Sequence, residues 1–152
     1  MAVLPALREV ARSRLAGRCH CGNVQLIFET DLPPEQLPLR ACQCTFCRAH
    51  AALNTTDPAG SVEIVVDDAA ELSRYEFGLR TAEFLICRRC GVYLAAVCTV
   101  DGSLYATINV NVLEDRSAFS RPAESMRYDG EDAAGRLARR KARWTPATLR
   151  IG

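Results

Sequence analysis

Three cysteines within six residues, Cys42, Cys44 and Cys47, are the feature that most restricts what this chain can fold into. The thiols are too crowded for three independent disulfides and too many for ordinary packing. Three thiolates that converge on one point suit Zn²⁺, which prefers soft sulfur ligands in a tetrahedral array. A structural zinc site normally has four protein ligands, whereas a catalytic site keeps three and leaves one position for water or substrate. The fourth ligand therefore decides between a structural and a catalytic role.

The other cysteines are grouped as well. Of the eight in the chain, Cys19 and Cys21 form one pair, Cys87 and Cys90 form another, and Cys98 stands apart. In a reducing compartment such spacing favours metal binding over disulfides. The two pairs are typical of a closed structural zinc site that joins hairpins distant in the sequence. A thioredoxin-like role for the second pair would need a βαβ context, which the sequence does not offer.

The length and charge of the chain limit its class. Its 152 residues fit a single domain, which we expect over residues 16–152, after an N-terminal extension over residues 1–15. The 19 Lys and Arg nearly balance the 18 Asp and Glu, which gives no general reason to expect nucleic acid or an anionic membrane as a partner. No apolar run approaches the roughly 20 residues of a membrane span, and no secretory h-region is present. We therefore expect a cytoplasmic protein and leave its oligomeric state open.

Short runs of alternating or β-branched residues predict a mostly β domain. Strands are expected over residues 23–29, 39–44, 61–66, 72–77, 81–86, 92–97 and 104–112. One or two helical turns are expected over 46–52, and a short C-terminal helix after Gly130 that Pro146 ends. Residues 54–60 are polar and rich in turn formers, so we expect a loop near the three-cysteine group.

Two residues could complete the coordination of the three-cysteine group. His50 follows Cys47 by three residues, so both would share one face of a helix and could form a closed Cys₃His site. Cys98 is the other possible ligand, although a buried free cysteine commonly acts as a small hydrophobic residue. If the site is open, His50 is instead the candidate proton donor, or a hydrogen-bonded histidine without chemistry. Sequence spacing leaves these alternatives open.

Several other polar residues have a functional and a simpler interpretation. Arg48 could bind a substrate carboxylate, or could be solvated after the turn. Asn109 and Asn111 could line a pocket, or could be exposed strand residues. The basic run over residues 136–143 could contact nucleic acid, but nearby acidic residues and the near-neutral total charge favour a solvated helix face.

Three motifs that occur in order resemble those of a known family. They are Gly17-x-Cys19-His20-Cys21-Gly22-x-Val24, Cys42-x-Cys44-x-x-Cys47-Arg48 and Phe84-x-x-Cys87-x-x-Cys90-Gly91. Together they are similar to the glutathione-dependent formaldehyde-activating enzyme and centromere protein V family, which has the Mss4-like all-β fold. The resemblance implies several short antiparallel sheets stapled by zinc.

The resemblance also implies two Zn²⁺ ions per chain. A structural zinc is expected on Cys19, Cys21, Cys87 and Cys90, and a catalytic zinc with an open fourth position on Cys42, Cys44 and Cys47. The family's reference reaction condenses formaldehyde with glutathione to S-hydroxymethylglutathione and is classed as a carbon–sulfur lyase activity. We therefore expect an enzyme that adds a thiol to a small aldehyde, or removes it. The alternative is a non-catalytic, zinc-scaffolded interaction domain.

The chain departs from the family pattern in three places. Ala51 occupies a position near the second motif where glycine is common, residues 105–111 match only loosely, and the tail over residues 124–152 resembles no assigned segment. These differences concern the substrate rather than the metal ligands.

Overall fold

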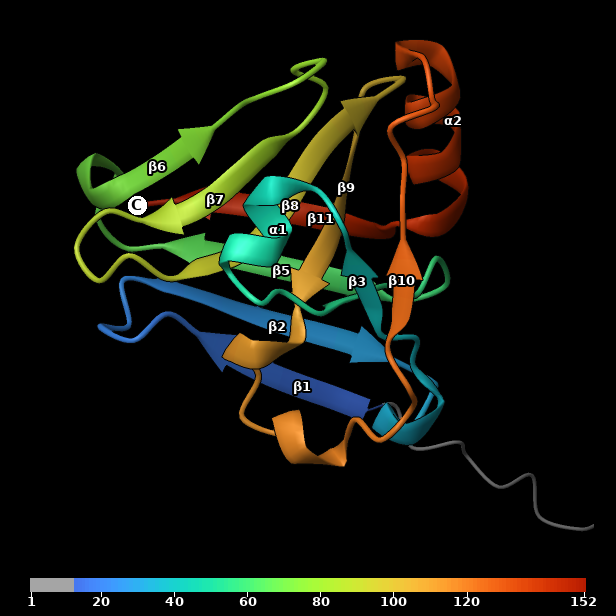
Figure 1. Ribbon diagram of the computed structural model, residues 1–152. Coiled ribbons are helices and arrows are strands. Elements are labelled where there is room, and N and C mark those ends of the chain that lie inside the picture. Colours follow the sequence, from blue (N-terminus) through green and yellow to red (C-terminus); the bar gives the residue numbers. More distant parts are fainter. Residues whose placement is uncertain (1–12) are drawn as a thin grey trace, which may run out of the picture.

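The computed structural model describes residues 13–152, and within them eleven strands form one mixed sheet (Figure 1). The strand order is β1-β2-β5-β11-β9-β4-β3-β10, and β8, β7 and β6 branch from β9. The mostly β prediction is therefore confirmed. Residues 1–12 of the expected N-terminal extension lie outside the described residues, whereas residues 13–15 begin strand β1.

One end of the sheet is an antiparallel group of three strands that covers the core. The strands are β1 (Ser13–Arg18), β2 (Val24–Thr30) and β5 (Ser61–Val66). Along β2 the side chains of Val24, Leu26 and Phe28 are buried while the intervening residues are more exposed, as the alternation of residue types predicts. Leu26 lies opposite Ile64 of β5, so the apolar faces of both strands meet the same core.

The second group is a meander that carries the more distant cysteines. It contains β6 (Leu72–Tyr75), β7 (Glu83–Cys87), β8 (Tyr93–Val100) and β9 (Ser103–Asn109), paired antiparallel in that order. Strand β8 is buried at six consecutive residues, which explains its nearly continuous apolar sequence, because both of its faces are covered.

The last strand, β11 (Thr145–Ile151), is absent from the sequence-based prediction, which ended the C-terminal helix at Pro146 and expected nothing after it. It runs parallel to β5, with Leu149 opposite Ile64, and pairs at its start with β9. Pro146 stands near the beginning of the strand, where a missing backbone N–H interrupts the ladder least. The strand was missed because its stability comes from the edge of β5, which is distant in the sequence.

The remaining elements surround the three-cysteine group. They are β3 (Arg40–Cys42), α1 (Thr45–Ala49), β4 (Asn54–Thr55), β10 (Glu124–Met126) and α2 (Ala133–Arg143). Strand β10 runs parallel to β3 and places Met126 opposite Cys42. Figure 1 shows the chain continuing from β10 into the segment that leads to α2. The Asp132 carboxylate caps α2 by accepting a hydrogen bond of 2.7 Å from the Gly135 amide.

Four single 3₁₀ turns complete the described chain: η1 (Pro34–Gln36), η2 (Ala69–Glu71), η3 (Val110–Val112) and η4 (Arg116–Ala118). Within residues 13–152, neither α1 nor α2 has the length and apolar character that crossing a membrane requires.

Candidate metal centres and the basic pocket

The four cysteines of the two predicted pairs meet in space. The Sγ atoms of Cys19, Cys21, Cys87 and Cys90 all lie within 4.8 Å of one another, and none forms a disulfide. The Cys19–Cys21 and Cys21–Cys87 sulfur distances are 3.7 and 3.5 Å. Zn–S bonds of about 2.3 Å in a tetrahedron place sulfur atoms about 3.8 Å apart. This group could therefore hold a tetrahedral metal ion with little rearrangement.

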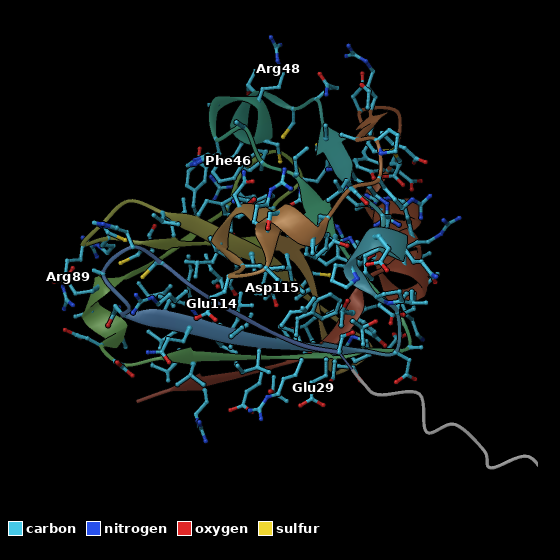
Figure 2. All side chains as sticks on the ribbon, turned by 90° about the horizontal axis from the view of Figure 1, so that it is seen from below. Glu29, Phe46, Arg48, Arg89, Glu114 and Asp115 are labelled. Atoms are coloured by element: carbon cyan, nitrogen blue, oxygen red, sulfur yellow. The ribbon has the colours of Figure 1, made fainter. Side chains whose placement is uncertain are left out.

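Two tight turns position these four thiols. Cys19 and Cys21 lie in the β1–β2 turn, where Gly22 has a φ of 84°. Cys87 ends β7, and the Gly91 amide closes the following turn on its carbonyl at 2.8 Å with a φ of 79°. Both glycines occupy the left-handed region, which other residues rarely adopt. Arg89, in the second turn, is exposed at the end of the molecule (Figure 2).

The thiols of this group differ in their electrostatic surroundings. The backbone of Asn23 donates a hydrogen bond that lowers the pKa of Cys21, whereas burial raises the pKa of Cys87 to about 12. A buried thiolate is unfavourable unless a cation compensates its charge. The arrangement therefore suits a metal ion, which displaces the protons of coordinating thiols.

The second group consists of Cys42, Cys44 and Cys47, whose Sγ atoms also lie within 4.8 Å of one another. Cys42 ends β3, Cys44 is the N-cap of α1, and Cys47 is buried within α1. The Cys44 sulfur accepts a hydrogen bond of 3.3 Å from the Cys47 amide. A hydrogen bond from the Cys47 thiol lowers the pKa of Cys42, and the same bond raises the pKa of Cys47. This group of three soft sulfur donors could hold a second metal ion.

Neither possible fourth ligand joins this group. Among residues 13–152, no His, Asp, Glu or further Cys brings a ligand atom into it. His50 caps the end of α1, and its ring centroid lies 4.5 Å from that of Phe46 and 5.6 Å from that of Tyr93. Cys98 packs instead in a separate apolar cluster that includes Trp144.

The three thiols open onto a pocket of about 520 Å³ with an aromatic wall. Phe77, Phe84 and Tyr93 line the pocket, and Phe46 of α1 (Figure 2) packs against these three rings at centroid distances of 5.4, 4.7 and 5.1 Å without lining the pocket itself. Tyr93 lines the pocket and is only 2% exposed, and its hydroxyl has no hydrogen-bond partner in the described chain. Burial raises the pKa of Tyr93, so the hydroxyl remains a donor beside the three sulfur atoms.

Three of the other predicted polar residues lie away from the pocket lining. Arg48 is exposed and points away from the body of the molecule (Figure 2). Asn109 is buried and donates to the Tyr93 carbonyl at 3.0 Å. Asn111 donates to the Ala51 carbonyl at 3.0 Å. The two asparagines therefore position the walls of the site and do not face a ligand.

Ala51 has a φ of 49°, in the left-handed region that glycine adopts more readily than alanine. We expect Ala51→Gly to raise the free energy of unfolding by about 0.5–1 kcal/mol, because it removes the left-handed strain of a residue with a Cβ. Urea unfolding of the metal-bound protein measures this. The matched control is Ala49→Gly within α1, which should lower the stability by about 1 kcal/mol. A loss of stability in both variants would contradict strain at Ala51.

The opposite side of the pocket is strongly basic. Six arginines and one aspartate line it, and the arginines are Arg40, Arg127, Arg136, Arg139, Arg140 and Arg143. Four of them come from the basic run of α2, which was expected to be a solvated helix face. That expectation is wrong, because the i, i+3, i+4, i+7 spacing of these four places them on one face of the helix, and this face borders the pocket. Only the tertiary packing of α2 shows this role.

Comparisons with known proteins agree with the two thiol groups. Residues 14–129 match the sequence profile of a family described as glutathione-dependent formaldehyde-activating enzyme. A crystal structure of a Rhodobacter sphaeroides protein is similar, with 30% identity, coverage of 72% of this chain and 99% of that chain, and a TM-score of 0.51. The curated proteins give no match. The family match includes all seven grouped cysteines, whereas α2 and β11 lie beyond it.

Proposed function

Because the chain belongs to the glutathione-dependent formaldehyde-activating enzyme family, we propose that it is a zinc-dependent enzyme of the carbon–sulfur lyase type. It would add a thiol, glutathione or a similar compound, to a small aldehyde or remove it. The observation that carries this proposal is the group of three thiols at a pocket wall, to which the described residues add no fourth ligand. An open position of this kind is characteristic of catalytic rather than structural zinc.

Two zinc ions have different roles in this proposal. Cys19, Cys21, Cys87 and Cys90 would hold a structural ion that joins the β1–β2 turn to the β7–β8 turn. Cys42, Cys44 and Cys47 would hold the catalytic ion, which when bound supplies a Lewis acid that orients a thiolate or a carbonyl oxygen. The sulfur distances in the first group and the absence of disulfides fit this assignment.

The reaction itself needs few steps. The thiol loses its proton, its sulfur forms a bond to the aldehyde carbon, and the carbonyl π electrons move to the oxygen, which takes up a proton. The reverse reaction breaks the carbon–sulfur bond and returns the proton to sulfur. The basic side of the pocket favours the thiolate, because positive charge stabilises it before attack. The rings of Phe77, Phe84 and Tyr93 give the pocket an apolar side against which a small aldehyde would pack.

Two neighbouring residues, His50 and Tyr93, are the proposed proton donors to the oxygen of the aldehyde. His50 stays the candidate predicted by proximity in sequence, and its ring lies against Phe46 and Tyr93. The Tyr93 hydroxyl is the donor that lines the pocket, and sequence reasoning did not identify it. Tyr93 follows Cys90 by three residues within the apolar strand β8, so the sequence reads as core packing and offers no signal for this role.

The test is a measurement of metal content together with thiol–aldehyde exchange. We expect about two zinc ions per chain. NMR exchange spectroscopy should show that the protein accelerates the interconversion of formaldehyde plus glutathione with their hemithioacetal, in proportion to protein concentration. Metal-free protein provides the background rate. If the zinc-loaded protein leaves the exchange at the background rate across a panel of thiols and aldehydes, a zinc-scaffolded interaction domain becomes the better account.

A further inference from the structure

The pocket carries more positive charge than its own acidic residues neutralise. Arg136 and Arg139 share Glu131, at 3.6 Å for Arg136 and 2.8 and 3.0 Å for the two contacts of Arg139. Arg139 also lies over the ring of Tyr128 at 3.7 Å. These two guanidinium groups therefore have an anionic partner within the protein. Arg40 and Arg140 differ, because no carboxylate of the described chain forms an ion pair with them.

Arg140 is the more deeply buried of the two and is only 7% exposed. Its guanidinium donates to Thr81 Oγ1 at 2.7 Å and lies over the Trp144 ring at 4.7 Å, while its Nε has no hydrogen-bond partner in the described chain. Cys98 is its other neighbour, but burial raises the pKa of the Cys98 thiol, so the group facing Arg140 is neutral. A buried cation without an anion is unfavourable and calls for a compensating charge.

Arg40 is a second guanidinium group that lines the same pocket and forms no ion pair with a carboxylate of the described residues. It is half-buried and donates to Thr56 Oγ1 at 2.7 Å. Burial, together with the positive charges of Arg143 and Arg139, lowers the pKa of Arg40, and Arg139 also acts on Arg140 in this way. Arg139 is therefore close enough to both Arg40 and Arg140 for its positive charge to disfavour theirs, and a bound anion would offset this cost.

From these contacts we propose that the basic side of the pocket binds an anionic group of the substrate, a carboxylate or a phosphate, between Arg40 and Arg140. Arginine suits both groups, because its planar donors match two oxygen atoms at once. Arg140 belongs to α2, which lies beyond the family match at residue 129, so this recognition is a property that the tail of this chain adds. The class of substrate rests on the proposed function, whereas the anion site rests on the arginines alone.

The geometry of β3 limits the size of the substrate. Arg40 and Cys42 are two residues apart in the strand, so their side chains leave the same face, with Cα atoms about 7 Å apart. An anionic group held by Arg40 therefore lies a few bonds from an atom that reacts beside Cys42. Short acidic thiols or short acidic aldehydes fit this separation.

Anion binding is tested on the full zinc-loaded chain by calorimetric titration with inorganic phosphate and, separately, with succinate, against chloride at equal ionic strength. We expect saturable binding of at least one of the two, and the preferred probe distinguishes phosphate from carboxylate recognition. Arg140→Met and Arg40→Met should each weaken it by about tenfold or more. Arg150→Gln is the matched control, because Arg150 is an exposed arginine of β11 that pairs with Glu63, and it should bind as the wild type does. Binding no stronger than that of chloride, or binding unchanged in both methionine variants, would overturn the proposal.

Two additions keep the test decisive. If Arg140→Met does not fold, Arg40→Met and Arg143→Gln carry the comparison, since both residues line the same pocket at less buried positions.

In the exchange assay, 3-mercaptopropionate should react faster than 2-mercaptoethanol and cysteamine, and the Arg140→Met variant should lose this preference. Anion binding without any turnover would support the anion site between Arg40 and Arg140 and contradict the proposed function. Turnover that does not depend on substrate charge, in a protein that binds no anion, would support the proposed function and contradict the anion site.

Discussion

Replacing Cys87 by serine is expected to destabilise the whole domain and to remove one of its bound metal ions. The Cys87 side chain is fully buried, and its sulfur lies 3.5 Å from that of Cys21, which belongs to a hairpin distant in the sequence. Structural zinc supplies about 10–16 kcal/mol in small peptides, compared with about 5–15 kcal/mol for the net stability of a typical domain. Loss of one ligand should therefore remove a large part of the stability, and chelation of the metal should have a similar effect.

Thermal unfolding followed by circular dichroism, with metal analysis of the same samples, measures this effect. Cys98→Ala is the matched control, because Cys98 is also a buried free cysteine but belongs to neither sulfur group. This variant should keep its metal content and lose only a small part of its stability. A Cys87→Ser protein that melts at the wild-type temperature with unchanged metal content would contradict the structural assignment of the four-cysteine group.

Cys44→Ser has a different expected result: loss of the second metal ion and of activity in a protein that remains folded. Cys44 is only partly buried and contributes its sulfur as the N-cap of α1. Serine is among the best N-cap residues, so its hydroxyl can accept the Cys47 amide hydrogen in place of the sulfur. The hydroxyl is, however, a poor ligand for a soft metal site. We therefore expect metal content to fall from about two ions to about one per chain.

The exchange assay should then give the rate of metal-free protein, while the thermal transition stays within a few degrees of the wild type. Cys44→Ala separates the two roles of this residue, since it also removes the cap and should cost about 1 kcal/mol more than serine. In Co²⁺-substituted protein, the sulfur-to-metal absorption should weaken in both variants. A Cys44→Ser protein with wild-type activity would show that the three-cysteine group is not the catalytic centre.

Much of the candidate site could be predicted from the sequence because its ligands are held by local structure. Cys19 with Cys21, and Cys87 with Cys90, each lie in one tight turn, so spacing along the chain determines how their sulfur atoms converge. The β2 and β5 strands were predicted for a similar reason, since the alternation of apolar residues directly reports one buried face. The short helix expected over residues 46–52 was predicted from its local sequence as well and is α1, over Thr45–Ala49.

The strands that depend on distant partners were not predicted. Residues 13–15 were assigned to an extension but begin β1, which pairs with β2, and β10 is a three-residue strand that exists through its pairing with β3. The loop expected over residues 54–60 contains β4, because Asn54 and Thr55 find partners in β9. Such short segments have too little pattern of their own to be distinguished from loops.

The sequence alone therefore determined the two sulfur groups and the mostly β class, because ligand spacing and strand alternation act over a few residues. Tertiary structure decided that neither His50 nor Cys98 joins the three-cysteine group, and that four arginines of α2 line a pocket. The physical reason is that a charge pattern on a helix is the same whether that face meets water or a cavity. What α2 packs against depends on β8, which is remote from it in sequence.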